Sequence, residues 1–214
     1  MLNSNKPLSQ EGVEFLGECH PLLEQLGSTD GLFTLTGVAA SLRLPEVASL
    51  ESLAQFLEAY QSQLLLPLEW PAIQRAHDHA SRNEVRELIA LDLEIAAQNK
   101  HHDFAAASRR VGRTQLQRLR PLRDARIVQR YLEAVEAQEA HAWHTLVYGV
   151  TLAIYSLPVR QGLLGYARQT LKSFVQSAAR PLRLSADDCS ALLEPLCATL
   201  PCKLEAMLNE AGAD

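Results

Sequence analysis

The chain has 214 residues, of which 47% are apolar and 21% are charged, with a formal net charge of −5. This is the composition of an ordinary globular protein, which excludes a disordered or collagen-like chain. The acidic balance argues against a general nucleic-acid binder, which usually carries a basic excess. Because the length suits one buried core, we expect a single domain over residues 1–214, with a flexible N-terminus at 1–20.

The N-terminus, the apolar runs and the cysteines bear on where the protein works. Residues 1–15 lack the cationic start and apolar run of a secretory signal. The most apolar window, 146–157, falls short of the ~20 residues that span a bilayer. Two disulfides are possible in principle, but we expect reduced, packed thiols and hence a cytoplasmic protein without a membrane partner. The cysteines are Cys19, Cys189, Cys197 and Cys202.

Apolar residues recur with a helical period near 3.6 along most of the chain. The one strand-like run, 32–38, has no second run to pair with. An apolar stripe over 47–64 predicts a helix that ends at Pro67, because proline interrupts helices. A second stripe over 85–96 predicts a helix that Asn83 caps.

The segment 145–156 is apolar on nearly every side, which predicts a helix at the centre of a bundle. Gly149 within it costs ~1 kcal/mol relative to alanine, so we expect a neighbouring helix to approach closely there. Pro181 is expected to end the helix that begins at Pro158. The sequence therefore predicts an all-α, single-domain bundle of about ten helices, the later ones near 128–135, 158–180, 185–199 and 201–210.

Seven histidines raise the question of a metal site. His141 and His144 can share a helix face, but a carboxylate-bridged di-metal bundle needs two Glu-x-x-His motifs, and residue 138 is Gln138. No nucleophile elbow or phosphate-binding loop is present. We therefore expect structural histidines, no catalytic residue, no bound metal and no cofactor. The remaining pairs point to different helix faces or precede a helix: His77 and His79, and His101 and His102 beside Asp103.

The region between Phe104 and Tyr131 is strongly basic, with eight arginines and one acid, Asp124. It has no interleaved aromatic residues, which disfavours RNA binding by base stacking. Two interpretations stay open: a solvated helix face, or a docking surface for an acidic protein partner, since guanidinium groups suit carboxylate recognition. The arginines are Arg109, Arg110, Arg113, Arg118, Arg120, Arg123, Arg126 and Arg130, and the first three are the candidate partner-binding residues.

Several short patterns follow one another in a fixed order. They are FTLTGVAASLRLP at 33–45, SRRVG at 108–112, and the segment from HTLVYG to ARPL at 144–182. Together they resemble the UreF family of urease accessory proteins, whose motifs occur in the same order over roughly residues 20–200. The matching positions are Phe33, Gly37, Ser41, Leu44, Ser108, Gly112, His144, Gly149 and Pro181.

The chain also departs from the family pattern. After Pro181 the family's Gly-Gln repeats are replaced by RLSADDCSALL, and the chain reaches Asp214 without the family's basic tail. It is thus either a divergent accessory protein or a paralogue with a changed partner. In the N-terminal motif, the family's proline, glycines, aromatic and acid are replaced by Thr34, Thr36, Val38, Arg43 and Pro45.

The resemblance implies a non-enzymatic maturation chaperone that assists nickel insertion. Such a protein is a dimeric scaffold that links a UreD- or UreH-type accessory protein and a nickel-carrying UreG-type GTPase to apo-urease. It would hold no metal tightly itself. Two alternatives remain: a helical-bundle enzyme whose haem or metal is held by His141 or His144, and a helical adaptor with a different partner.

Overall fold

The computed structural model describes residues 35–98 and 105–211, and this part of the chain contains helices and no strand. The predicted all-α class is confirmed. The three elements between Leu50 and Ser81 are continuous with one another. The described residues therefore form eight helical segments, slightly fewer than the ten expected. The elements are α2 (Leu35–Ser41), α3 (Leu50–Tyr60), the π-helix η1 (Gln61–Glu69), α4 (Trp70–Ser81), α5 (Val85–Ala97), α6 (Ala105–Arg118), α7 (Arg126–Glu136), α8 (His144–Ile154), α9 (Val159–Leu182) and α10 (Ala186–Ala211).

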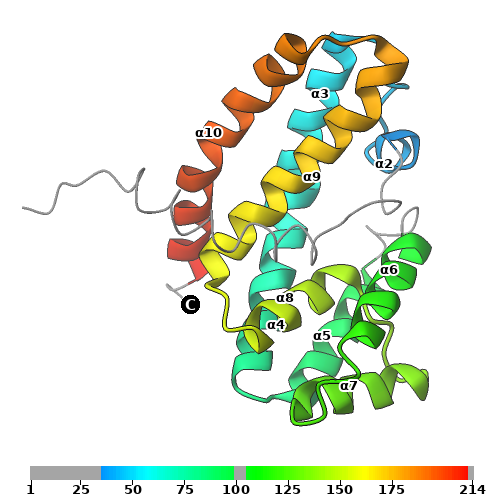
Figure 1. Cartoon of the computed structure of the whole chain (residues 1–214), viewed down its shortest axis with the longest axis vertical. Helices are drawn as coiled ribbons and strands as arrows, with labels where there is room; N and C mark the ends of the chain where they lie inside the picture. The colour runs from blue at the N-terminus through cyan, green and yellow to red at the C-terminus, as the bar shows by residue number, and fades with distance from the viewer. Residues whose placement is uncertain (1–34, 99–104, 212–214) are drawn as a thin grey trace, which may run out of the picture.

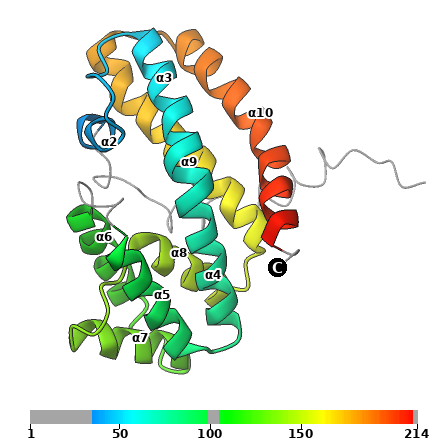
Figure 2. The same cartoon turned by 180° about the vertical axis from the view of Figure 1, so that it is seen from behind.

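The helices form two groups that share α4 and α8. Helices α3, α9 and α10 lie together at one end with α2 beside them, and α5, α6 and α7 lie at the other end (Figures 1 and 2). Each group surrounds its own hydrophobic cluster. Helix α4 supplies Trp70 and Ile73 to the first cluster and Ala72 and Ala76 to the second. The shared pair α4 and α8 therefore joins the two ends.

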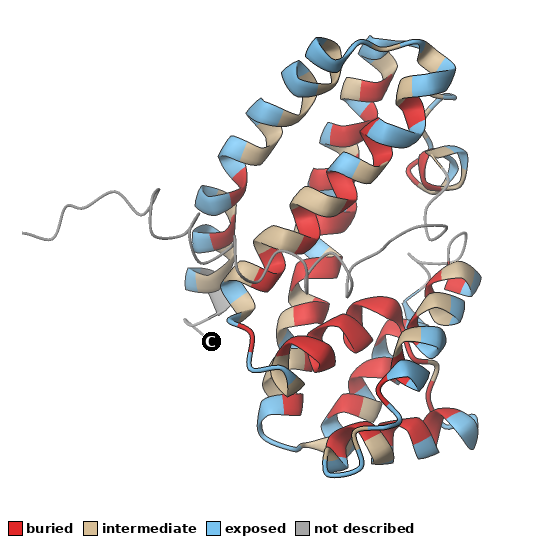
Figure 3. Ribbon diagram, in the orientation of Figure 1, coloured by how far each residue is buried: buried red, intermediate tan, exposed pale blue. Residues whose placement is uncertain are grey.

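Helix α8 is the most deeply placed element. Every residue from His144 to Leu152 is buried, and Figure 3 shows the helix red along most of its length. It packs most extensively against α4 and next against α6. The prediction that an apolar helix over 145–156 lies at the centre of the bundle is confirmed.

The prediction that Pro67 ends a helix is wrong. The chain continues from α3 through η1 into α4, and the Trp70 N–H bonds to the Leu65 carbonyl, five residues back. In a regular α-helix a proline ring clashes with the carbonyl four residues earlier. The wider π turn is a rare variant, often found at functional sites, and here it carries the chain past Pro67.

Prolines also fail to end the last helices. Helix α9 includes Pro181 and extends to Leu182, and α10 is one helix through Pro195 and Pro201 instead of the expected pair. The strand-like interpretation of 32–38 is wrong for residues 35–38, which lie in α2, while residues 32–34 lie outside the described residues.

Within residues 35–98 and 105–211, five helices end on a non-glycine residue with positive φ. In each case the next N–H bonds to the carbonyl five residues before it, as Glu84 bonds to His79. This is the Schellman arrangement, which usually places glycine at the left-handed position. Asn83 fills that position after α4 and so ends one helix rather than capping α5, whose N-cap is Glu84. The five residues are Arg43, Asn83, Gln138, Ser156 and Arg183.

Two glycines allow backbone segments to touch. A Cβ on Gly149 would lie 2.3 Å from the Ile73 carbonyl oxygen, and one on Gly112 would lie 1.9 Å from that of Ala142. Both distances are far below van der Waals contact, and the obstacle in each case is backbone. The expected close approach at Gly149 is confirmed, and α4 is the helix that approaches.

We expect Gly149→Leu to lower the free energy of unfolding by about 1–3 kcal/mol, because the new side chain must push α4 away from α8. The matched control is Ala90→Leu on the exposed face of α5, which should change stability by less than about 0.5 kcal/mol. Urea unfolding of both variants measures the difference. Equal midpoints for the two variants would mean that the contact at Gly149 yields without cost.

Candidate functional site

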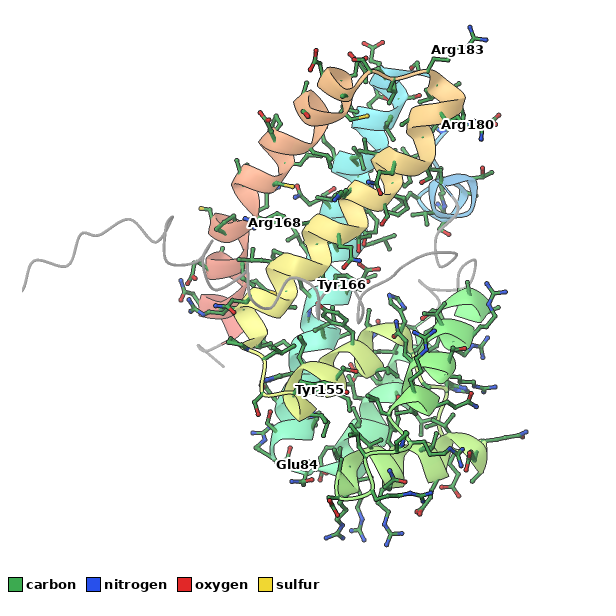
Figure 4. The ribbon with its side chains drawn as sticks, viewed as in Figure 1. Glu84, Tyr155, Tyr166, Arg168, Arg180 and Arg183 are labelled. Atoms are coloured by element: carbon green, nitrogen blue, oxygen red, sulfur yellow. The ribbon has the colours of Figure 1, made fainter. Side chains whose placement is uncertain are left out.

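Helix α6 presents two different faces. Its inner face carries Ser108 and Gly112, which are buried, and its outer face carries Arg110 and Arg113, which are exposed. Figure 4 shows nitrogen-tipped side chains pointing outward around α6 and α7. The residues that match the family motif thus hold the helix in place, and the arginines lie on the surface that it presents.

The loop between α7 and α8 is held by a buried carboxylate, Asp92 of α5. It accepts hydrogen bonds from the Tyr131 hydroxyl at 2.5 Å and from the backbone N–H groups of His141 and Ala142 at 2.7 and 2.9 Å. The Asp92 carbonyl accepts a further bond from the Trp143 indole at 3.1 Å. These contacts fix the residue at which α8 begins, and hence the position of the histidine that follows.

His144 is the first residue of α8 and uses both ring nitrogens. Nδ1 lies 2.7 Å from the Ser108 hydroxyl, and Nε2 lies 2.8 Å from the hydroxyl of Tyr166, labelled on α9 in Figure 4. The His144 backbone N–H points at the Ser108 oxygen at 3.4 Å, so the Ser108 hydroxyl proton can go to Nδ1 and leave the ring proton on Nε2. Both ring nitrogens of His144 therefore have hydrogen-bond partners within the protein.

The polar contacts continue to a buried acid at the end of η1. The Tyr60 hydroxyl donates to Glu69 Oε2 at 2.5 Å, and the Tyr166 hydroxyl also lies near the carboxyl. Burial raises the pKa of Glu69 to about 7, partly offset by the two tyrosines. The Tyr166 hydroxyl also interacts with the carboxyl and lowers its pKa, although Oε1 forms no hydrogen bond of ordinary geometry. We call Ser108, His144, Tyr166, Glu69 and Tyr60 the polar relay.

A pocket of about 360 Å³ opens beside the polar relay. Glu69, Ser108 and His144 form part of its wall. Arg75 and Glu94 also line it and pair with each other at 2.7 Å, both being about half exposed. Most of the remaining described lining is apolar, from Pro67, Leu68, Pro71, Ala72, Leu91, Ile95 and Trp143.

The three candidate partner-binding arginines are not equivalent. Arg109 is half-buried, with its guanidinium carbon 5.5 Å from the centre of the Trp143 ring and its Nε donating to the Ala105 carbonyl at 3.3 Å. Arg110 and Arg113 are exposed, as are the other five arginines of the run. Two of those five form surface ion pairs, Arg120 with Glu136 and Arg130 with Glu133.

His141 and His144 do not share a helix face, although their spacing of three residues would allow it. His141 precedes α8 and bonds to Asp92 through its backbone, so it does not share a helix face with His144. His77 and His79 contact neighbouring acids on the surface, Asp78 and Glu84. Within residues 35–98 and 105–211, no three His, Cys, Asp or Glu side chains gather as a metal site would require. His101, His102 and Asp103 lie outside the described residues.

Four further family-motif positions in the described part of the chain are not members of the polar relay: Gly37, Ser41, Leu44 and Pro181. The Ser41 hydroxyl bonds to the Gly37 carbonyl at 2.9 Å within α2, and Leu44 packs on the first hydrophobic cluster. Pro181 is exposed in the last turn of α9, and Phe33 lies outside the described residues.

The cysteines differ from one another in exposure. Cys189 and Cys197 are half-buried free thiols, whereas Cys202 is an exposed one, so the prediction of a packed thiol is wrong for Cys202. Cys202 follows Pro201 within the continuous helix α10. Cys19 lies outside the described residues.

Sequence reasoning missed Glu69 and Asp92. The available signal was an acid within an apolar run, LLLPLEW for Glu69 and LIALDLEI for Asp92. A charged residue on the buried stripe of a helix must find a partner, which helical periodicity alone does not identify.

We expect Glu69→Gln to remove a pH dependence of stability. The folded-state pKa of Glu69 is raised from 4.5 to about 7, so its favourable contribution is full below pH 4.5 and is lost as pH rises through 7. Relative to wild type, the variant should gain on the order of 3 kcal/mol between pH 4 and pH 8. Urea unfolding at both pH values tests this, and a pH-independent difference would contradict it.

Comparison with known proteins agrees with the resemblance in the sequence. A family model described as UreF matches residues 47–197, which is most of the chain, whereas no curated protein matches it. The match includes Glu69, Asp92 and the whole arginine run. None of the described helices combines the length and apolar character needed to cross a membrane. The chain therefore belongs to the UreF family, whose members are urease accessory proteins rather than enzymes.

Proposed function

We propose that this protein is a scaffold for nickel insertion into urease. It would link a UreD- or UreH-type accessory protein and a nickel-carrying UreG-type GTPase to apo-urease, acting as a homodimer in the cytoplasm. Family membership supports the maturation role. The commitment of both His144 ring nitrogens to Ser108 and Tyr166 supports a role in binding proteins rather than in holding haem or metal.

The proposal depends on one observation: the inner face of α6 is buried and held by contacts, whereas its outer face is basic and exposed. Gly112 brings the backbone of α6 against the Ala142 carbonyl, and Ser108 bonds to His144, so the helix is firmly seated. Arg110 and Arg113 lie on the opposite face and are exposed. A rigid row of guanidinium groups suits a partner surface rich in carboxylates, since each group can donate two parallel hydrogen bonds.

The test reverses the charge of Arg110 and Arg113 to Glu and leaves Arg109 in place, because that side chain packs on Trp143. We expect wild-type melting behaviour, since both residues are exposed. The affinity for the UreD- or UreH-type partner should fall by about tenfold or more, because each arginine then repels acids that it attracted. Pull-down and titration at low and high salt measure this, and the wild-type interaction should itself weaken with salt.

The matched control reverses Arg86 on α5 and Lys172 on α9, which are also exposed. It changes the net charge by the same amount on helices other than α6, so it should bind like wild type. Equal and salt-insensitive recovery of the partner by all three proteins would show that the arginine run is a solvated face.

A further inference from the structure

The charged groups and the imidazole in the described wall of the pocket already interact within the protein. Arg75 donates to both carboxylate oxygens of Glu94 at 2.9 and 2.7 Å. His144 uses both ring nitrogens, and Glu69 is only 2% exposed with its Oε2 bound by Tyr60. A polar molecule in the pocket would lose hydrogen bonds to water and gain few from these groups, so an apolar occupant is favoured.

The apolar part of the wall is large enough for a ring and is held in place. Leu91, Ile95 and Trp143 belong to it, and the Trp143 indole donates to the Asp92 carbonyl at 3.1 Å. The pocket volume of about 360 Å³ is more than twice the roughly 150 Å³ of an apolar cavity that holds benzene. A preformed pocket of this size accepts one aromatic side chain.

Helix α6 connects the pocket with the arginine surface. Ser108 lines the pocket, and the guanidinium carbon of Arg109 lies 5.5 Å from the centre of the Trp143 ring. Arg110 and Arg113 are exposed on the same helix. Because a helix with its side chains is about 10–12 Å wide, one partner surface of about 800 Å² can cover the pocket and both arginines.

We propose that the pocket anchors one aromatic side chain of the UreD- or UreH-type accessory protein, at a position flanked by acidic residues in that partner. The ring lies against Leu91, Ile95 and Trp143, and the flanking carboxylates pair with Arg109 and the exposed arginines of α6. This inference rests on the proposed scaffold function and adds to it the apolar contact that holds the complex together.

The pocket and the arginines contribute to binding in different ways. A buried aromatic anchor supplies a large part of the binding energy of an interface, and burial of apolar surface depends little on salt. Exposed arginines speed association and select an acidic partner, and salt screens their effect. Measurements at two ionic strengths therefore separate the two contributions.

The first experiment titrates the full chain with three capped peptides: acetyl-Glu-Phe-Glu-amide, acetyl-Glu-Ala-Glu-amide and acetyl-Lys-Phe-Lys-amide. The amide signals of Leu91, Ile95 and Thr145, which line the pocket, are followed by NMR. We expect saturable shifts with Glu-Phe-Glu. The Lys-Phe-Lys peptide should bind at least tenfold more weakly because its charges repel the arginines, and the Glu-Ala-Glu peptide should cause no shift at these positions.

The second experiment measures binding of the accessory protein to a variant with a filled pocket. Ala72→Leu adds a side chain to the pocket wall, and its matched control, Ala90→Leu, adds the same side chain on the exposed face of α5. The pocket variant should lose the Glu-Phe-Glu shifts and bind the accessory protein at least tenfold more weakly, by the same factor at low and high salt. The control should bind both like wild type.

A second pocket variant is used if circular dichroism shows that Ala72→Leu does not fold. Gln98 is exposed and also lines the pocket, so Gln98→Trp covers the pocket from its rim without a change in the core. It should weaken binding of the Glu-Phe-Glu peptide and of the accessory protein as Ala72→Leu does.

Three results would overturn the inference. The first is equal affinity of the accessory protein for wild type and the folded pocket variant, which would leave the scaffold function standing. The second is equal binding of the Phe and Ala peptides, and the third is equal binding of the Glu-Phe-Glu and Lys-Phe-Lys peptides. Failure of the accessory protein to bind wild type at all would instead contradict the scaffold function itself.

Discussion

The arrangement of the helices depends on the hydrogen bonds that the Asp92 carboxylate accepts. It holds Tyr131 of α7 together with the backbone of His141 and Ala142. Ala142 has φ of 58°, a conformation that costs an alanine roughly 1 kcal/mol, and the two N–H bonds to Asp92 offset that cost. The same loop presents the carbonyl that contacts Gly112 and starts α8 at His144. One buried acid therefore sets the positions of α6, α7 and α8.

The seating of α6 connects this constraint to function. Glycine at position 112 removes the side chain that would separate α6 from the loop, and Ser108 bonds to His144 beside it. Both contacts lie on one side of the helix, so its other side is free to carry Arg110 and Arg113 at fixed positions. Preorganised charged groups lose less conformational entropy on binding, which favours a helix over a loop for a docking surface.

Helical periodicity is sufficient for the fold class and the central helix α8, and the cost of glycine inside a helix indicates the close contact at Gly149. It failed where the signals that end helices were misleading. Pro67 lies within a continuous helix because η1 has a wider turn, and the Schellman ends use residues such as Arg43 and Arg183 instead of glycine. The polar relay joins residues far apart in sequence, such as Ser108, His144 and Tyr166, and helical periodicity does not indicate such pairs.

The polar relay has a structural consequence that an apolar core would not provide. Ser108 lies on α6 at one end of the molecule, whereas Tyr60 and Tyr166 belong to the hydrophobic cluster at the other. Apolar residues of the same volume are often as stable as a buried polar group or more so, but they pack in several registers. The hydrogen bonds of His144 to Ser108 and to Tyr166 form together in only one register. We infer that the relay fixes α6 relative to α9, and so fixes the arginine surface relative to the rest of the scaffold.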